Sequence, residues 1–209
     1  MTMSITQNTP CSGGPCVTPS CSPDPPDGCA NSCALPTLQS PPPCPSTNQV
    51  QDVFCVSNIG ATFSNPYTYI PNCQGTGIDM PLFASDIWYS FVATGNMLDI
   101  NVTGGIASPS VGLYSGNNCN SLIGIGCANG VGGTVNVTFN LLLVGQTYWI
   151  HISGADATDQ GVADLTLTSY NDCNNCLLNA TLTVTPTPVN NTYQAGQTVT
   201  FVIDIVEIL

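Results

Sequence analysis

The chain of 209 residues contains no lysine and no arginine, although it contains 12 aspartate and glutamate residues and 12 cysteines. An average chain of this length would carry roughly 25 basic residues. Salt bridges to lysine or arginine therefore cannot contribute to this fold, and no permanently cationic side chain offsets the formal net charge of −12. Stability has to come from apolar burial, backbone hydrogen bonds and covalent cross-links.

The same absence excludes several classes of function. Lysine-based phosphate loops, arginine clamps, Schiff-base lysines and basic nucleic-acid tracks all need residues that the chain lacks. A net charge of −12 should also repel nucleic acids and anionic membrane surfaces. No stretch approaches the ~20 apolar residues of a membrane-spanning helix. We therefore expect neither a nucleic-acid partner nor membrane insertion.

The cysteine content predicts disulfides and an oxidising compartment, because a cytosolic chain rarely carries so many cysteines. A zinc site is the weaker alternative, since the chain has a single histidine, His151, and a single CxxC motif, Cys173 to Cys176. The first residues have neither the basic nor the apolar region of a signal peptide. We expect a processed or truncated form of a secreted, extracellular or cell-surface protein.

Three segments differ in composition. Residues 1–48 hold six of the 12 cysteines and a proline cluster, without apolar periodicity, which predicts an irregular leader and spacer; a knottin-like binding module is the alternative. Residues 49–178 consist of short alternating runs separated by Gly/Asn turns, which predicts an all-β, disulfide-stapled antiparallel β-sandwich or jelly roll. Residues 179–209 predict a C-terminal β extension.

Two of the predicted strands carry large side chains on both faces. Residues 86–93 place Ile87 on one face and Trp88 on the other. Residues 146–153 place Ile150 on one face, and Trp149 and His151 on the other. We expect His151 to face solvent or an interface, and the two tryptophans to be available for stacking on a sugar ligand.

The last residues form an apolar alternating strand that includes Val199, Phe201, Ile203 and Ile205. Two strands alone are marginal in water, and an exposed apolar edge invites pairing. We therefore expect residues 179–209 to be the start of a second β unit or an assembly strand. Its partner would be a further domain of the same polypeptide or another copy in a homo-oligomer.

Several motifs in residues 55–178 occur in the order of a known family. DIWYSF at 86–91, PSVGLYSG at 109–116, a Cys-bounded loop at 119–127 and GQTYWI at 145–150 resemble jelly-roll modules of secreted Bacteroidota surface proteins, which are related to pre-peptidase C-terminal and CUB-like domains. The resemblance implies an accessory, non-catalytic module of an adhesive protein exported by the type IX pathway. It also implies three short-range disulfides: Cys55–Cys73, Cys119–Cys127 and Cys173–Cys176.

Catalytic chemistry finds little support in the sequence. No G-x-S-x-G elbow is present. Glycoside hydrolysis needs two Asp or Glu side chains across a cleft, and the only glutamate, Glu207, lies near the chain end. Calcium is the better cofactor hypothesis, with Asp156, Asp159 and Asp164 as the densest carboxylate group; solvated loop aspartates are the alternative. We expect a non-enzymatic structural or adhesive component, with an accessory carbohydrate- or protein-binding module of a secreted enzyme as the alternative.

Overall fold

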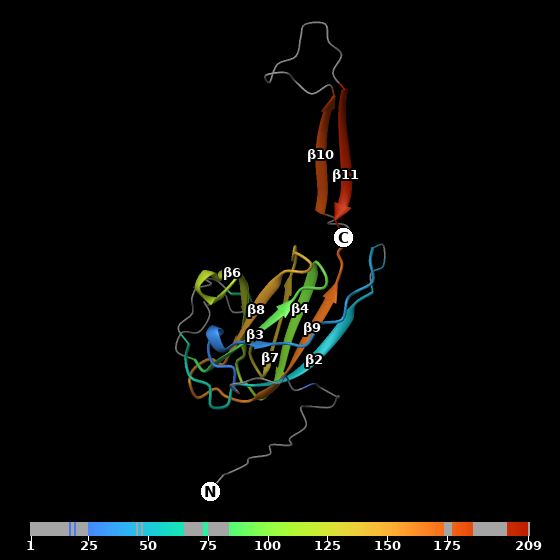
Figure 1. Ribbon diagram of the computed structural model, residues 1–209. Helices are drawn as coiled ribbons and strands as arrows, with labels where there is room; N and C mark the ends of the chain where they lie inside the picture. Colours follow the sequence, from blue (N-terminus) through green and yellow to red (C-terminus); the bar gives the residue numbers. More distant parts are fainter. Residues whose placement is uncertain are drawn as a thin grey trace.

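A computed structural model of the protein shows a two-layer β-sandwich followed by a β-hairpin (Figure 1). The structure describes residues 17, 19, 25–44, 46, 48–64, 73, 74 and 84–173, together with the backbone of residues 177–185 and 200–208. Within these ranges the helical elements are two short 3-10 turns, η1 (Cys29–Asn31) and η2 (Cys119–Ser121). The predicted all-β class is confirmed.

The sandwich consists of a four-stranded and a five-stranded sheet. The first has the order β2 (Val50–Ser57), β9 (Val162–Tyr170), β4 (Met97–Gly104), β7 (Thr134–Phe139). The second has the order β1 (Cys33–Ala34), β3 (Asp86–Val92), β8 (Thr147–Ser153), β5 (Ser110–Ser115), β6 (Ile123–Asn129). Consecutive strands from β2 to β9 alternate between the sheets except for the β5–β6 hairpin, and β2 pairs with β9 while β3 pairs with β8. This is jelly-roll topology, as predicted.

The main core lies between the two sheets and follows from the period of two along each strand. Ile100 of β4 and Leu165 of β9 face Ile87 of β3 and Ile150 of β8, and all four are fully buried. On the opposite side of β4 and β9, alternate positions are polar and partly exposed. The alternation therefore fixes the register, because a slip by one residue would turn the apolar set outward.

The N-terminal segment is part of the sandwich, which corrects the predicted leader and spacer. Strand β1 pairs in parallel with β3, so that Cys33 lies opposite Tyr89. Leu35 and Leu38 are buried in the main core. The predicted division at residue 48 therefore does not separate residues 33–38 from the β-sandwich. The segment lacks periodicity because it contributes only a two-residue strand and single anchoring side chains.

The hairpin consists of β10 (Leu177–Thr185) and β11 (Thr200–Ile208), which pair antiparallel with each other and with no strand of the sandwich. Figure 1 shows it extending away from the sandwich beyond the end of β9. Phe201, Ile203 and Ile205 of the predicted assembly strand lie on β11, whereas Val199 lies outside the described residues. Because two strands are marginal alone, the expectation of a partner for this region stays a prediction.

Candidate functional site

Disulfides connect distant parts of the chain. The described bridges are Cys29–Cys119, Cys44–Cys173 and Cys73–Cys127, with sequence separations of 90, 129 and 54. Cys33 and Cys55 are disulfide-bonded as well. The predicted pairings Cys55–Cys73, Cys119–Cys127 and Cys173–Cys176 are therefore wrong, although each of these cysteines within the described residues is in a bridge. Cys176 lies outside the described residues.

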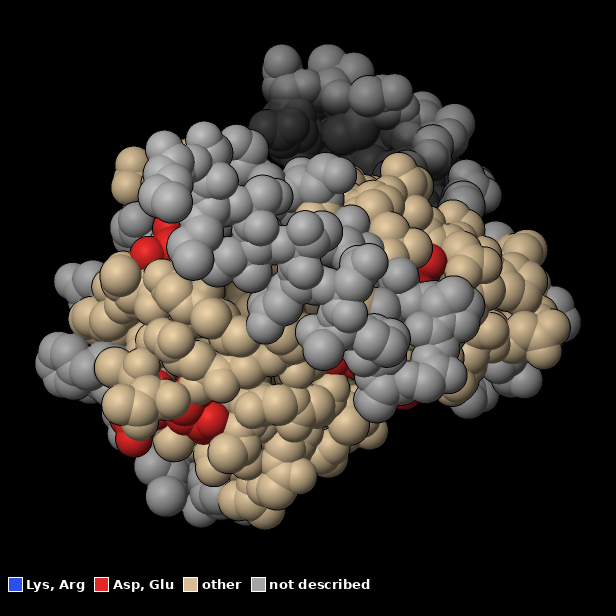
Figure 2. All heavy atoms as spheres, turned by 90° about the horizontal axis from the view of Figure 1, so that it is seen from below, with Lys and Arg blue, Asp and Glu red and all other residues tan. Residues whose placement is uncertain are grey.

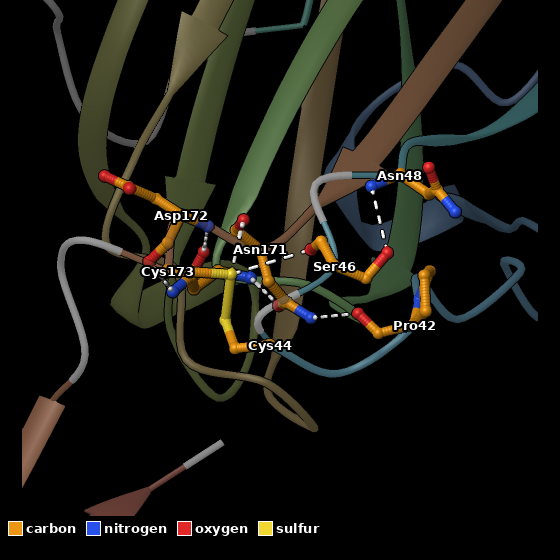
Figure 3. The surroundings of a disulfide bond; sticks show 8 residues. Pro42, Cys44, Ser46, Asn48, Asn171, Asp172 and Cys173 are labelled. Carbon is orange, nitrogen blue, oxygen red and sulfur yellow. Dashed lines mark hydrogen bonds between the residues drawn. A yellow bond between two sulfur atoms is a disulfide. The ribbon is translucent and has the colours of Figure 1, made fainter.

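The bridges link the N-terminal segment and the loops covalently to the sandwich. Cys29–Cys119 joins η1 to η2, and Cys73–Cys127 joins a loop to β6. Figure 3 shows Cys44–Cys173 tying the N-terminal segment to the end of β9, where Asn171 also donates to the Pro42 carbonyl at 3.1 Å. Closing loops this long restricts the unfolded chain by about 4–5 kcal/mol each in the chain-entropy model. These disulfides indicate an oxidising, non-cytoplasmic compartment.

A second, smaller core covers the outer face of the five-stranded sheet. It contains Trp88, Tyr114 and Trp149 under the disulfides Cys29–Cys119 and Cys73–Cys127. Trp88 is completely buried and Trp149 is 8% exposed. The prediction that these tryptophans form a stacking platform for sugars is therefore wrong, because both side chains are buried among the residues of this core.

His151 lies in the same region, and the prediction that it faces solvent or an interface is also wrong. It is 3% exposed, and its Nε2 lies 2.8 Å from Oδ2 of Asp86, which is itself buried. Ser64 Oγ donates to the same carboxylate at 2.6 Å, and Trp88 Nε1 donates to Ser64 Oγ at 2.9 Å. The buried carboxylate is thus held by a hydroxyl and an imidazole, as a buried charge requires.

This Ser/Asp/His group does not have the geometry of a hydrolase triad. In a triad the histidine lies between the serine and the carboxylate and takes the proton from the serine. Here Asp86 lies between Ser64 and His151, and the Ser64 hydroxyl is occupied by Asp86 and Trp88. Burial, and then the charge of Asp86, raise the pKa of the nearby Tyr114 hydroxyl, so this tyrosine cannot act as a base. The hydrogen bonds among Ser64, Asp86 and His151 instead hold the side chains of the second core in place.

The three aspartates proposed for calcium do not converge on a site. The Asp159 carboxylate accepts from the backbone N–H groups of Ala107, Ser108 and Ala155. Asp156 accepts from the backbone N–H and the hydroxyl of Thr158. Among the described residues, no group of three or more His, Cys, Asp or Glu side chains could hold a metal ion. The oxygens of Asp156 bind within the β8–β9 loop, and those of Asp159 also bind this loop to the loop between β4 and β5.

These hydrogen bonds also set the ionisation of the loop. Partial burial raises the pKa of Asp159, but the three backbone N–H groups lower it by more, so the net shift is downward. Hydrogen bonds from Thr158 hold the pKa of Asp156 below its ordinary value. Figure 2 shows carboxylates as scattered patches among uncharged side chains on the face turned away from the hairpin. No lysine or arginine exists to pair with them.

The comparisons with known proteins are negative. No protein-family model and no curated protein matches the chain. Among the described residues, no helix has the length and apolar character needed to span a membrane.

The surface feature that stands out is an apolar rim at the end of the sandwich from which the hairpin departs. The rim consists of Val92, Leu141, Leu143 and Val144, which are 47–58% exposed. Three of them lie in the β7–β8 loop, and Val92 lies beside this loop at the end of β3, opposite Thr147. Clusters of exposed large apolar residues commonly mark interaction sites. The sequence contains a signal for the rim in the run LLLV at 141–144.

Proposed function

We propose that the protein is a non-catalytic structural component of an extracellular assembly, in which the stapled jelly roll is the rigid unit. The observation that carries this proposal is the β10–β11 hairpin, which forms a sheet of its own and pairs with none of the sandwich strands that the structure describes. A hairpin of two strands needs a further strand or layer to be stable in water. An assembly partner supplies that layer.

The covalent framework supports the same role. Bridges spanning 54 to 129 residues hold the N-terminal segment, the β6 region and the end of β9 on one body. Trypsin has no cleavage site in a chain without lysine and arginine. From the resemblance to jelly-roll modules of Bacteroidota surface proteins, we infer that the assembly lies on a bacterial surface and that the chain is exported by the type IX pathway.

The alternative of a carbohydrate-binding module is less well supported, because Trp88 and Trp149, the side chains expected to stack on a sugar, are buried in the second core. A protein-binding module would use the same exposed surfaces as an assembly component. The structural role is therefore the better supported of these functions.

The test is to measure the molar mass of the native, oxidised protein at increasing concentration by size exclusion with light scattering, and to examine the same samples by electron microscopy. We expect a concentration-dependent increase in mass that ends in a defined oligomer or filament. A strictly monomeric protein at every concentration and ionic strength would contradict the proposal.

A further inference from the structure

We propose that the apolar rim of one copy binds the apolar face of the β10–β11 hairpin of a second copy. The inference rests on the proposed function and specifies its contact. It starts from the rim loop, which is built as a rigid projection. Leu141 has a φ of 58°, a left-handed conformation that costs a residue with a side chain about 1 kcal/mol or more. Such strain persists only where the surroundings enforce it, and it clusters at functional positions.

The surroundings of the rim do enforce this conformation. Leu142, between the exposed leucines, is 2% exposed and anchors the loop in the core. Its N–H donates to the Asn96 carbonyl at 3.0 Å. The Leu143 N–H donates to the hydroxyl of Tyr148 at 2.9 Å. The loop therefore presents Leu141 and Leu143 to solvent in a fixed arrangement, which lowers the entropy lost on binding.

The register of the hairpin gathers apolar residues on one of its faces. Residues directly opposite each other in an antiparallel pair lie on the same face. The pairs on this face are Ala180 with Ile205, Leu182 with Ile203, and Val184 with Phe201. The opposite face is mixed: it holds four threonines, Asn179 and Asp204, together with Leu177, Val202, Val206 and Ile208. The first face is therefore the more apolar of the two, and among the described strands none of the sandwich pairs with the hairpin.

Both surfaces lie at the same end of the molecule. The Asn96 carbonyl accepts from Leu142, and Asn96 Oδ1 accepts from the Asp172 N–H at 2.7 Å, next to the Cys44–Cys173 bridge that precedes the hairpin. Asn96 therefore binds both the rim loop and the segment that follows β9. A two-fold arrangement of copies then places each hairpin against the rim of the other, in a self-complementary interface.

The length of the hairpin and the distribution of charge indicate that a second copy of the chain binds the rim. A strand of nine residues is about 30 Å long, and Figure 1 shows the hairpin extending away from its own sandwich. The hairpin thus extends past the sandwich of its own chain (Figure 1). Copies with a net charge of −12 repel each other, but residues 139–147 contain no carboxylate. Glu207, at one end of the hairpin, is the only charge on its apolar face.

The test uses two full-length variants and their mixture. Leu143→Asp introduces a charge on the rim at an exposed position, and Ile203→Asp introduces a charge on the hairpin face. We expect the self-association of each variant alone, measured by sedimentation velocity, to be weaker than that of the natural chain by about tenfold or more. An equimolar mixture should form a heterodimer, because one variant retains an intact hairpin and the other an intact rim. Val131→Asp, at an exposed apolar site on the opposite end, is the matched control and should associate normally.

The outcomes separate the inference from the proposed function. Association of the natural chain that is unchanged by both variants would overturn the rim–hairpin contact and leave the structural role standing. Loss of association only for Ile203→Asp would indicate contact between hairpins, and it would also overturn the inference. Weakened variants that fail to complement each other in the mixture would show that rim and hairpin do not meet across copies. A natural chain that is monomeric throughout would overturn both proposals.

Discussion

Removal of the Cys44–Cys173 bridge by the double substitution Cys44→Ser and Cys173→Ser should strongly destabilise the sandwich. The bridge closes a separation of 129 residues, the longest of the three described. The chain-entropy model gives about 5 kcal/mol for a loop of this length, and about 4 kcal/mol remains because other bridges already shorten the path between the two residues.

The loss should appear in thermal unfolding followed by circular dichroism. For a protein of this size, about 4 kcal/mol corresponds to a decrease in Tm of roughly 8–16 °C. The control is the natural chain with all bridges reduced, which should unfold at a still lower temperature. A decrease of less than about 2 °C in the oxidised double variant would refute the reasoning, because it would mean that this bridge does not constrain the unfolded chain.

The remaining predictions concern side chains at fixed positions. Asp159→Asn should cost about 2 kcal/mol at neutral pH, because an amide nitrogen then faces backbone N–H groups. The lowered pKa of Asp159 means that its stabilising effect is present above the unfolded pKa near 3.9 and is lost as the pH falls through the lower folded pKa; urea titrations from pH 5 to pH 2 should therefore show a flatter acid decline in the variant. His151→Phe should cost about 3 kcal/mol, since it leaves Asp86 buried without the imidazole, and an unchanged urea midpoint would contradict the burial of this pair. Leu141→Gly should leave stability unchanged or raise it by up to about 1 kcal/mol, because glycine adopts a φ of 58° without strain; a large loss in thermal unfolding would contradict the left-handed assignment.

The sandwich could be predicted from the sequence because its information is local. Alternation along residues such as Leu98, Ile100 and Val102 identifies a strand with one buried face, and Gly/Asn clusters mark its ends. The alternation and the turns predict a sandwich or jelly roll, and the order of the strands within each sheet comes from the structure. The hairpin register also agrees with the alternation of Phe201, Ile203 and Ile205.

The disulfide pairing could not be predicted because it depends on which distant segments the fold brings together. Cys119 is eight residues from Cys127 in the sequence, but it lies in η2 beside η1, where Cys29 is its neighbour. Short sequence separation favours a pairing only when both cysteines lie on the same small loop. The position of the N-terminal segment on the sheets likewise depends on contacts between residues that are distant in the sequence.

The expected tryptophan site failed for a related reason. Alternation alone predicts that Trp88, Trp149 and His151 lie on an exposed outer face, as is common for an antiparallel sheet. The sequence did contain the contrary signal, because β3 and β8 carry large apolar or aromatic residues at both alternating sets of positions. Strands of this kind have both faces covered, here by the bridged segments around Cys29 and Cys73. The partner Ser64 has no comparable signal, since nothing in its local sequence places it beside Asp86.

Sedimentation equilibrium of the natural, oxidised chain as a function of sodium chloride concentration tests the central claim most directly. The account predicts that association strengthens with salt, because salt screens the repulsion between copies with a net charge of −12 while the apolar contact is retained. Association that weakens with salt would show that charge–charge attraction holds the copies together. A constant monomer mass over the whole range would contradict the structural role itself.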